Sequence, residues 1–184
     1  MEKKRIYCLI GSSGSGKSTI ARVLSKQGCP ELISQTTREP RVNERDGVNY
    51  YFITEQEYDK MGWVEKETYC GKRYGSSVNE VLGKLAENES VCAVVTYRGY
   101  EAFLNFFDGW KNVEVISVRV DGGDANELVK RLTLRQDTEE EIEKRVKQYY
   151  TEQELFKGKQ FDIIFYNTGR EEELEEKVRE NILI

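Results

Sequence analysis

The sequence predicts an α/β fold built on a mostly parallel sheet, and two observations support this prediction. Short runs of β-branched and aromatic residues alternate with segments of helical periodicity, which is the order expected for parallel strands joined by helices. A glycine- and serine-rich loop joins the first of these runs to the first helix. The length of 184 residues suits a single domain with a sizeable core.

The elements follow one another in a regular order. Six apolar runs are predicted as strands, at residues 5–10, 32–35, 50–53, 90–96, 113–120 and 161–166. Helical periodicity predicts helices at residues 16–27, 55–61, 78–87, 100–107, 125–134, 139–155 and 171–181. Capping boxes mark several helix starts, among them Thr54 with Glu57 and Thr138 with Glu141. A further strand at residues 63–70 would lie beside residues 50–53 in a small insert. The charged segments 139–147 and 171–179 are predicted as solvated helix faces.

The composition limits the class of protein. The net charge is −5, so the chain has no general attraction to nucleic acid or to anionic membranes. No segment is long and apolar enough to span a bilayer, and no secretory signal follows the charged N-terminus, so we expect a cytoplasmic protein. The four cysteines are widely spaced, which indicates reduced core thiols. The absence of histidine excludes a His-based catalytic triad and zinc sites that use histidine.

The run from Gly11 to Ser18 fits the phosphate-loop pattern G-x-x-x-x-G-K-[ST]. Glycines allow the backbone to curl so that its N–H groups point at phosphate oxygens, and the following helix adds its positive N-terminal end. Lys17 would reach the outer phosphates, and the Ser18 hydroxyl would take a magnesium ion. The predicted phosphate-binding residues are Gly11, Ser12, Ser13, Gly14, Ser15, Gly16, Lys17, Ser18 and Thr19. A plain turn before a helix is the alternative, but the strand, loop, Lys-Ser pair and helix all agree with phosphate binding.

Two groups of arginines suggest further phosphate contacts. Arg38 and Arg41 lie three residues apart in a loop that a proline keeps extended, which suits bidentate recognition of a second phosphate. Arg131 and Arg135 are four residues apart on one predicted helix, so they project from one face, and Arg145 follows on the next helix. Two helices joined by a short turn would make a flap that closes over phosphates. Taken alone, such arginines are usually solvent-exposed, and the phosphate loop is what favours the binding interpretation.

Further motifs extend this pattern along the chain. The segment from Thr36 to Phe52 follows T-T-R-x-x-R-x-x-E-x-x-G-x-x-Y-x-F. Later motifs are Trp63-Val64-Glu65, Tyr74-Gly75-Ser76, Arg131-Leu132 with Arg135, Thr138 to Arg145, Asp162 and Asn167. With these motifs the chain resembles the guanylate kinase family over nearly its whole length, in the same order and at close to the same spacings.

The resemblance implies a three-layer P-loop kinase fold with a parallel sheet core, a small mixed-β acceptor-binding insert and a helical lid. The implied divisions of this single domain are a core at about residues 1–33, 89–130 and 157–184, an insert at about 34–88 and a lid at about 131–156. The implied activity is transfer of the γ-phosphate of MgATP to GMP or dGMP, which gives ADP and GDP or dGDP.

The resemblance also assigns roles, residue by residue. The implied catalytic residues are Lys17, Arg38, Arg131, Arg135 and Arg145, with Asn167 at the adenine of ATP. The implied acceptor-binding residues are Ser34, Arg38, Arg41, Glu44, Tyr50, Glu65, Tyr74, Gly75, Ser76 and Thr96. Glu65 suits its role, because a carboxylate accepts hydrogen bonds from guanine N1–H and the 2-amino group, a pair that adenine does not offer. No general base is needed, because the acceptor's own phosphate oxygen is the nucleophile.

The chain departs from the family pattern at Val94 and Thr96, which stand where guanylate kinases have an Asp-x-Asp. One aspartate would support the metal and phosphate network and the other would bind the acceptor. Three interpretations stay open: a guanylate kinase, a kinase of this fold with another phosphorylated acceptor, or a non-catalytic binding module. The expected ligands are ATP, GMP or dGMP, and Mg²⁺. We expect no nucleic-acid or membrane partner, and a monomer or small homo-oligomer.

Overall fold

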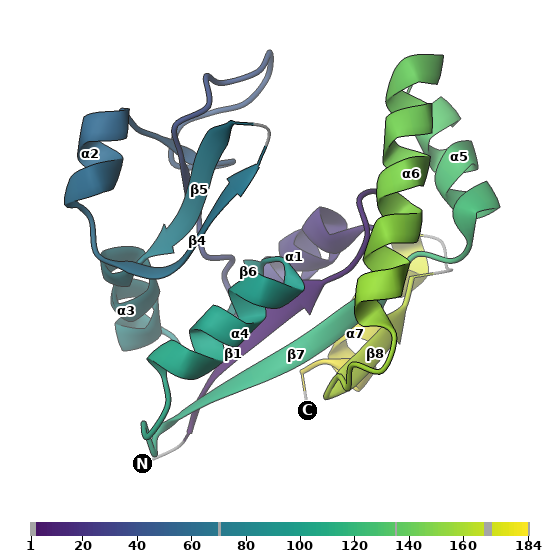
Figure 1. The fold of residues 1–184 in the computed structure, drawn as a ribbon. Helices are drawn as coiled ribbons and strands as arrows, with labels where there is room; N and C mark the ends of the chain where they lie inside the picture. Colours follow the sequence, from purple (N-terminus) through teal and green to yellow (C-terminus); the bar gives the residue numbers. More distant parts are fainter. Residues whose placement is uncertain (1–2, 70, 135, 168–170, 184) are drawn as a thin grey trace.

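A computed structural model describes residues 3–69, 71–134, 136–167 and 171–183. The larger of its two sheets is parallel throughout, with strand order β6-β1-β7-β8. Its strands are β1 (Lys4–Ile10), β6 (Ser90–Val94), β7 (Val113–Asp121) and β8 (Ile163–Tyr166). Because β1 is hydrogen-bonded on both sides, the loop that follows it starts from the middle of the sheet (Figure 1).

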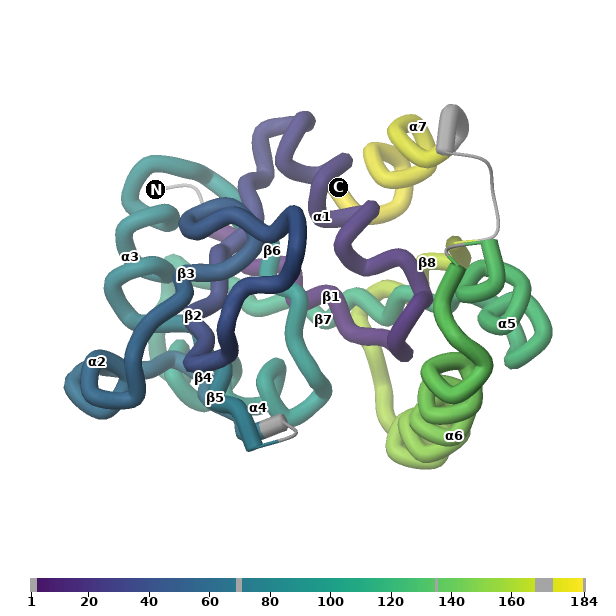
Figure 2. The backbone as a smooth tube through the Cα atoms, turned by 90° about the horizontal axis from the view of Figure 1, so that it is seen from above, coloured from purple at the N-terminus to yellow at the C-terminus, as the bar shows by residue number. Residues whose placement is uncertain are grey.

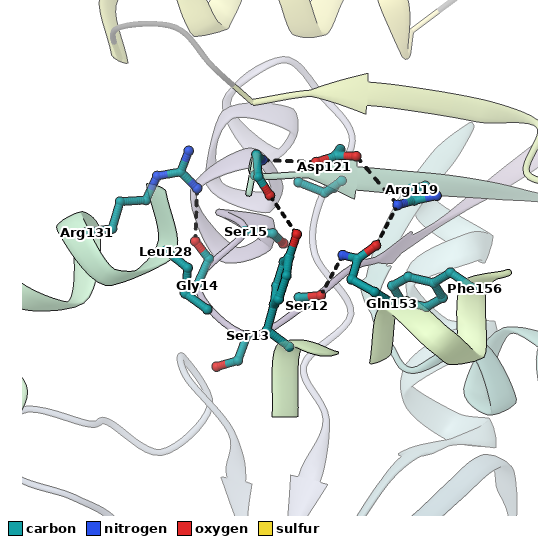
Figure 3. Close-up of a pocket in the computed structure, with 14 residues that line it drawn as sticks. Ser12, Ser13, Gly14, Ser15, Arg119, Asp121, Leu128, Arg131, Gln153 and Phe156 are labelled. Atoms are coloured by element: carbon teal, nitrogen blue, oxygen red, sulfur yellow. Dashed lines mark hydrogen bonds and ion pairs between the residues drawn. The ribbon is translucent and has the colours of Figure 1, made fainter. Parts of the chain in front are cut away.

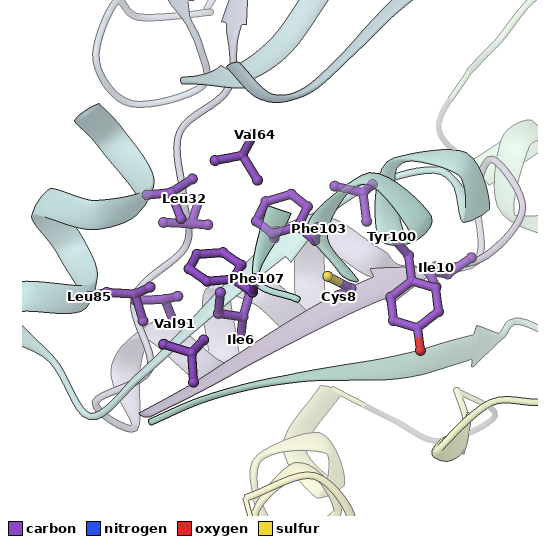
Figure 4. Packing of buried hydrophobic residues seen from close by; sticks show 14 of the residues in the cluster. Ile6, Cys8, Ile10, Leu32, Val64, Leu85, Val91, Tyr100, Phe103 and Phe107 are labelled. Atoms are coloured by element: carbon purple, nitrogen blue, oxygen red, sulfur yellow. The ribbon is translucent and has the colours of Figure 1, made fainter. Parts of the chain in front are cut away.

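Helices cover both faces of this sheet. One face packs against α1 (Lys17–Lys26) and α7 (Glu171–Asn181), and the other packs against α3 (Val78–Glu87) and α4 (Tyr97–Phe106). The alternation of side chains along a strand explains the two cores. Tyr7 and Leu9 of β1 are buried with α1 and α7, whereas Cys8 and its neighbours two residues away are buried with Phe103 of α4 and with Phe107, which directly follows α4 (Figure 4).

The smaller sheet is mixed, with strand order β3-β2-β5-β4. Its strands are β2 (Gln35–Thr36), β3 (Tyr51–Phe52), β4 (Trp63–Tyr69) and β5 (Lys72–Ser77). β2 runs parallel to β3 and antiparallel to β5, and β4 is antiparallel to β5. The short helix α2 (Glu55–Lys60) begins at the capping box of Thr54 and Glu57, as predicted, and its Tyr58 stacks on Trp63.

The remaining two helices, α5 (Ala125–Leu134) and α6 (Glu139–Phe156), lie antiparallel and pack against each other. The capping box of Thr138 and Glu141 starts α6, as predicted. Pairs such as Lys144 with Glu140 make the first half of α6 a solvated face, which also agrees with the prediction. Figure 2 shows this helix pair and the smaller sheet on opposite sides of the molecule.

Three predictions about the elements are wrong. The strand predicted at residues 63–70 does not lie beside residues 50–53, because the unpredicted strand β5 and then β2 separate them; Cys70 itself lies outside the described residues. The strand predicted at 90–96 ends at Val94, because the Thr96 hydroxyl accepts the Gly99 N–H (3.1 Å) and starts α4 at Tyr97. The strand predicted at 32–35 is reduced to Gln35–Thr36, because the Leu32 N–H instead donates to Cys92 of β6.

The predicted fold class is confirmed: an α/β protein with a parallel sheet between helical layers, a small mixed sheet and a helix pair. Of the cysteines, Cys8, Cys29 and Cys92 are free and buried, as predicted. None of the described helices combines the length and the apolar character needed to cross a membrane.

Candidate functional site

The predicted phosphate loop leaves the carboxyl end of β1 and turns directly into α1. Its curl is closed by a hydrogen bond from the Ser15 N–H to the Ser12 carbonyl (3.0 Å). Gly14 and Gly16 adopt φ values of 79° and 96°, which disfavour any residue with a side chain. At Gly16 a Cβ atom would also lie 2.0 Å from Asn167 Nδ2, so glycine lets the asparagine approach the loop.

Two hydroxyls of the loop bear on ligand binding. The buried Ser15 Oγ has no hydrogen-bond partner among the described residues, so its hydroxyl is available to donate to a bound anion. Ser18 is exposed in the first turn of α1. Among the described residues no cluster of three or more carboxylates and cysteines is suited to hold a metal. A lone hydroxyl fits a Mg²⁺ that arrives on nucleotide phosphates and keeps several waters.

Lys17 folds back over the loop. Its ammonium donates to the carbonyls of Gly11 (2.6 Å) and Ser12 (2.9 Å). Burial lowers the pKa of Lys17 to about 8, and the nearby Glu152 carboxylate opposes that shift. A phosphate beside the ammonium would favour its charged form, so this lysine is suited to an anionic ligand.

Arg131 of α5 also contacts the loop. Its guanidinium donates to the Gly14 carbonyl (3.2 Å) and to the Asn167 carbonyl (3.0 Å), and Figure 3 shows the first of these contacts. The side-chain amide of Asn167 donates to the Ser15 carbonyl (2.8 Å). Three predicted residues that are distant in the sequence, Lys17, Arg131 and Asn167, therefore meet on one loop.

The other helix of the pair, α6, also contacts the loop. Arg145 donates to the Ser13 hydroxyl and lies 3.3 Å from the Asp137 carboxylate. The Glu152 carboxylate accepts the backbone N–H of Ser13 (3.3 Å). Such N–H groups are the ones that a phosphate loop offers to an anion, so a carboxylate of this chain occupies one of them. The predicted Arg135 lies outside the described residues.

Four residues near the loop were not predicted: Arg119, Tyr149 and Gln153 line the space between the loop and α6, and Glu152 contacts Ser13. Arg119 of β7 donates to Gln153 (3.0 Å), whose amide donates to the Ser12 hydroxyl (3.4 Å), so this chain of contacts joins the sheet, the helix and the loop (Figure 3). The cavity enclosed there is only about 10 Å³, room for about one water molecule. No local sequence signal marks these residues, because the contacts that bring them together span 26 to 141 positions.

The second arginine group lies beside the smaller sheet. Arg38 is paired with Glu44, with Nη1 2.9 Å from Oε2, and its guanidinium lies 5.5 Å from the centre of the Tyr50 ring. Tyr50 packs edge-on against Tyr74 at 5.9 Å. The Arg38 guanidinium holds the pKa of Glu44 below its usual value, so this partly buried pair is charged at neutral pH. Arg41 is exposed, and its backbone N–H donates to Glu44 (2.7 Å).

Glu65 and Ser76 form a buried polar pair on β4 and β5. The Ser76 hydroxyl donates to Glu65 Oε1 (3.0 Å), and Glu65 is only 9% exposed. Burial raises the pKa of Glu65 above its usual value, although the Ser76 hydrogen bond opposes the shift. Gly75 has a packing role here: a Cβ atom at this position would lie 2.6 Å from the Trp63 ring.

The remaining predicted acceptor residues are Ser34 and Thr96. Ser34 is half-buried, and its carbonyl accepts the Tyr51 N–H (3.0 Å). Thr96 is exposed and caps α4, while Val94 at the end of β6 is half-buried. The side chains at these two positions therefore leave that end of β6 without a carboxylate.

The comparisons with known proteins agree on one family. The family model described as guanylate kinase matches residues 3–182. The chain belongs to the guanylate kinase family. It is 33% identical to a guanylate kinase of Thermobifida fusca over 196 residues, covering 95% of this chain and 89% of that protein. It is 31% identical to a guanylate kinase of Synechococcus over 183 residues, covering 94% and 79%.

A solved structure supports the fold. The crystal structure of guanylate kinase from Anaplasma phagocytophilum superposes with a TM-score of 0.67 over 98% of this chain and 85% of that one, at 20% identity. Guanylate kinases are phosphotransferases, so this chain is an enzyme of that class. The phosphate loop with its three cationic neighbours and the Glu65–Ser76 pair are the parts of this guanylate kinase family member on which a proposal of mechanism rests.

Proposed function

We propose that this chain transfers the γ-phosphoryl group of MgATP to GMP or dGMP, with the residues of the two groups described above. One observation supports the proposal most directly. An intact phosphate loop, contacted by Lys17, Arg131 and Arg145, occurs in the same domain as a buried carboxylate–hydroxyl pair suited to guanine. The first group fits a nucleoside triphosphate and the second fits a guanine nucleotide as the acceptor.

The transfer itself needs positioning and charge neutralisation more than covalent chemistry. A phosphate oxygen of GMP attacks the γ-phosphorus, a new P–O bond forms, and the bond between the γ-phosphorus and the bridging oxygen of ATP breaks to release ADP. No proton has to be removed from the nucleophile. When bound, Mg²⁺ supplies further neutralisation of the phosphate charge, and the hydroxyl of Ser18 is the group we expect to contact it.

The acceptor would be held at both ends. Arg38, oriented by Glu44, would bind the acceptor phosphate together with Arg41, Tyr50 and Tyr74. Glu65 would accept guanine N1–H and one hydrogen of the 2-amino group, with its other side fixed by Ser76. Ser34 and Thr96 stay in the proposed acceptor set. On the donor side, Asn167 would lie at the adenine.

The residues that support a different acceptor are Val94 and Thr96, since neither supplies the carboxylate of the family pattern. A kinase with another phosphorylated acceptor is therefore the second candidate. Cytoplasmic location and a monomeric or small homo-oligomeric state remain predictions.

A coupled ADP-release assay with MgATP tests the proposal against a panel of GMP, dGMP, AMP, CMP, UMP and no acceptor. Turnover with GMP or dGMP alone is the expected result. Turnover with only another acceptor would replace the proposed substrate. Lack of turnover with every acceptor, despite ATP binding, would favour a non-catalytic module. The Lys17→Ala variant serves as the inactive control.

A further inference from the structure

Glu67 lies on the same face of the smaller sheet as the proposed acceptor residues. Side chains two apart on a strand point the same way, so Glu67 and Glu65 share one face of β4. Their cross-strand partners on β5 are Tyr74 and Ser76 respectively. The other face is used differently: Arg73, the residue just before Tyr74 on β5, donates to Glu55 and Asp59 of α2.

This face meets the start of α4. A cavity of about 270 Å³ lies between the two elements and is lined by Lys66, Glu67 and Thr68 of β4 and by Arg98, Gly99 and Ala102 of α4. Gly99 lies beside Glu65, because a Cβ atom on it would lie 3.6 Å from Glu65 Oε2, and it lines the cavity together with Glu67. The two glutamates therefore converge on the same end of α4.

Glu67 also lacks an internal role. It is half-buried, yet it makes no hydrogen bond or ion pair with any residue in the described part of the chain. Its charge also adds to the burial effect that raises the pKa of Glu65, which indicates that the two carboxylates are close. Two neighbouring carboxylates with no cation paired to Glu67 repel each other, and a ligand with several N–H donors would relieve that repulsion.

Thr96 stands where the family pattern has an aspartate, and Glu67 lies close to the helix that Thr96 caps. Thr96 uses its hydroxyl to cap α4 and is followed within the same turn by Gly99, the residue that borders the cavity of Glu67. A carboxylate on β4 thus faces the helix end at which the family pattern has an aspartate.

We propose that Glu67 is a specificity-determining residue, a second carboxylate of the acceptor pocket that accepts a hydrogen bond from the guanine 2-amino group. This proposal rests on the function proposed above. Guanine offers three N–H hydrogens on this edge, one on N1 and two on the amino group. Glu65 can accept only a coplanar pair of them, N1–H and one amino hydrogen, which leaves the second amino hydrogen for Glu67.

The test compares GMP with IMP, which lacks the 2-amino group, and with dGMP, which lacks the ribose 2′-hydroxyl. We measure kcat/KM of the wild type, Glu67→Gln and Glu67→Ala for all three acceptors. Glu87→Gln, a change of the same chemistry at an exposed residue of α3, is the matched control. In Glu67→Ala the ratio of kcat/KM for GMP to that for IMP is expected to fall about tenfold or more, mainly through KM for GMP. The Gln variant keeps an acceptor oxygen and is expected to lose less.

Two results would overturn the proposal. A change in the GMP-to-dGMP ratio without a change in the GMP-to-IMP ratio would place Glu67 at the sugar instead of the base. Unchanged ratios in a folded Glu67→Ala variant, checked by circular dichroism, would make Glu67 a solvated strand residue. Failure of the proposed function itself is distinguishable, because the wild type would then not phosphorylate GMP at all.

Discussion

Positively charged side chains have different partners in two parts of the molecule. The proposed donor region is the phosphate loop with its neighbours on α5 and α6, and the proposed acceptor region is the loop of Arg38 with the adjoining smaller sheet. In the donor region Lys17 and Arg131 donate to backbone carbonyls, and the Ser13 N–H is taken by the Glu152 carboxylate. In the acceptor region Arg38 is paired with a carboxylate, Glu44. Carbonyl oxygens carry no net charge, so a cation that exchanges them for a phosphate gains a large electrostatic attraction. An arginine that is already paired with a carboxylate gains less attraction when it binds a phosphate.

The two regions also differ in the space that they leave. The loop and α6 enclose about 10 Å³, whereas the cavity beside Glu67 has about 270 Å³. The space between the loop and α6 is therefore too small for a nucleoside triphosphate, and we expect α6 to move away from the loop when the nucleotide binds. The cavity beside Glu67 is larger, so we expect less movement when the acceptor binds.

The largest effect is expected from Lys17→Ala, which removes one of the three cations that contact the phosphate loop. The rate of transfer should fall roughly 10²–10³-fold, as expected for loss of one group that stabilises charge in the transition state. The fold should be kept, because the hydrogen bonds of the Lys17 ammonium within the described residues go to two loop carbonyls and its charge is unfavourably buried. Coupled kinetics and a thermal melt measure both. A folded variant with wild-type turnover would remove Lys17 from the mechanism.

The next effect is expected in the acceptor region, from Glu65→Gln. The amide replaces one acceptor oxygen by a donor, and the loss of a charged hydrogen bond costs about 1.5–3 kcal/mol, or about 10- to 100-fold in kcat/KM for GMP. KM for ATP should change little. GMP binding needs the ionised form of Glu65. Because burial raises the pKa of Glu65, GMP affinity of the wild type should fall on acidification at a higher pH than it would with an unperturbed glutamate. An unchanged KM for GMP would contradict the guanine-binding role.

Local sequence patterns predicted the parts of the site that are local in the chain. The phosphate loop is one continuous segment, and its strand–loop–helix context is visible in the sequence, so its position and shape followed directly. Capping boxes located the start of α2 and α6 for the same reason. Arg38 was expected at a phosphate from its spacing to Arg41, whereas Glu44 was expected only from the family resemblance and its pairing with Arg38 was not predicted.

Local sequence patterns did not predict the features that depend on contacts between distant segments. β5 is a polar run that contains Gly75, and its strand conformation depends on pairing with β2 and β4. Glu152 is one of many charged residues on α6, and its contact with Ser13 was not predicted because it spans 139 positions. Glu67 was not singled out in the sequence, and only the strand register shows that it lies opposite Tyr74. Non-local contacts of this kind leave no periodic signal in the sequence.

An intermediate effect is expected from pH in the donor region. Lys17 has a pKa of about 8 in the free protein, and bound phosphates should raise it. Affinity for MgATP should therefore be full below pH 8 and fall as the pH rises through this value, by up to about tenfold per pH unit. Calorimetry at pH 8–9 in buffers of different ionisation enthalpy should detect proton uptake on binding. Proton release, or uptake that persists in Lys17→Ala, would refute the assignment.

The smallest effect is expected from Glu152→Gln, and its direction is opposite to the others. Glutamine can still accept the Ser13 N–H, but the competing negative charge is lost. Affinity for ATP should rise about two- to fivefold, the range expected for a partly exposed charge interaction. KM for ATP and binding of a non-hydrolysable analogue measure the change.

Glu154→Gln, two residues further on α6, is the matched control, because Glu154 is exposed and pairs only with Lys157 among the described residues. Affinity for ATP that rises equally in both variants would trace the effect to the net charge of the lid. Affinity that falls in Glu152→Gln would mean that Glu152 supports the nucleotide-binding shape of the loop. A rise confined to Glu152→Gln would show that the Glu152 carboxylate competes with the nucleotide for the Ser13 N–H, because only that carboxylate accepts this N–H among the described residues.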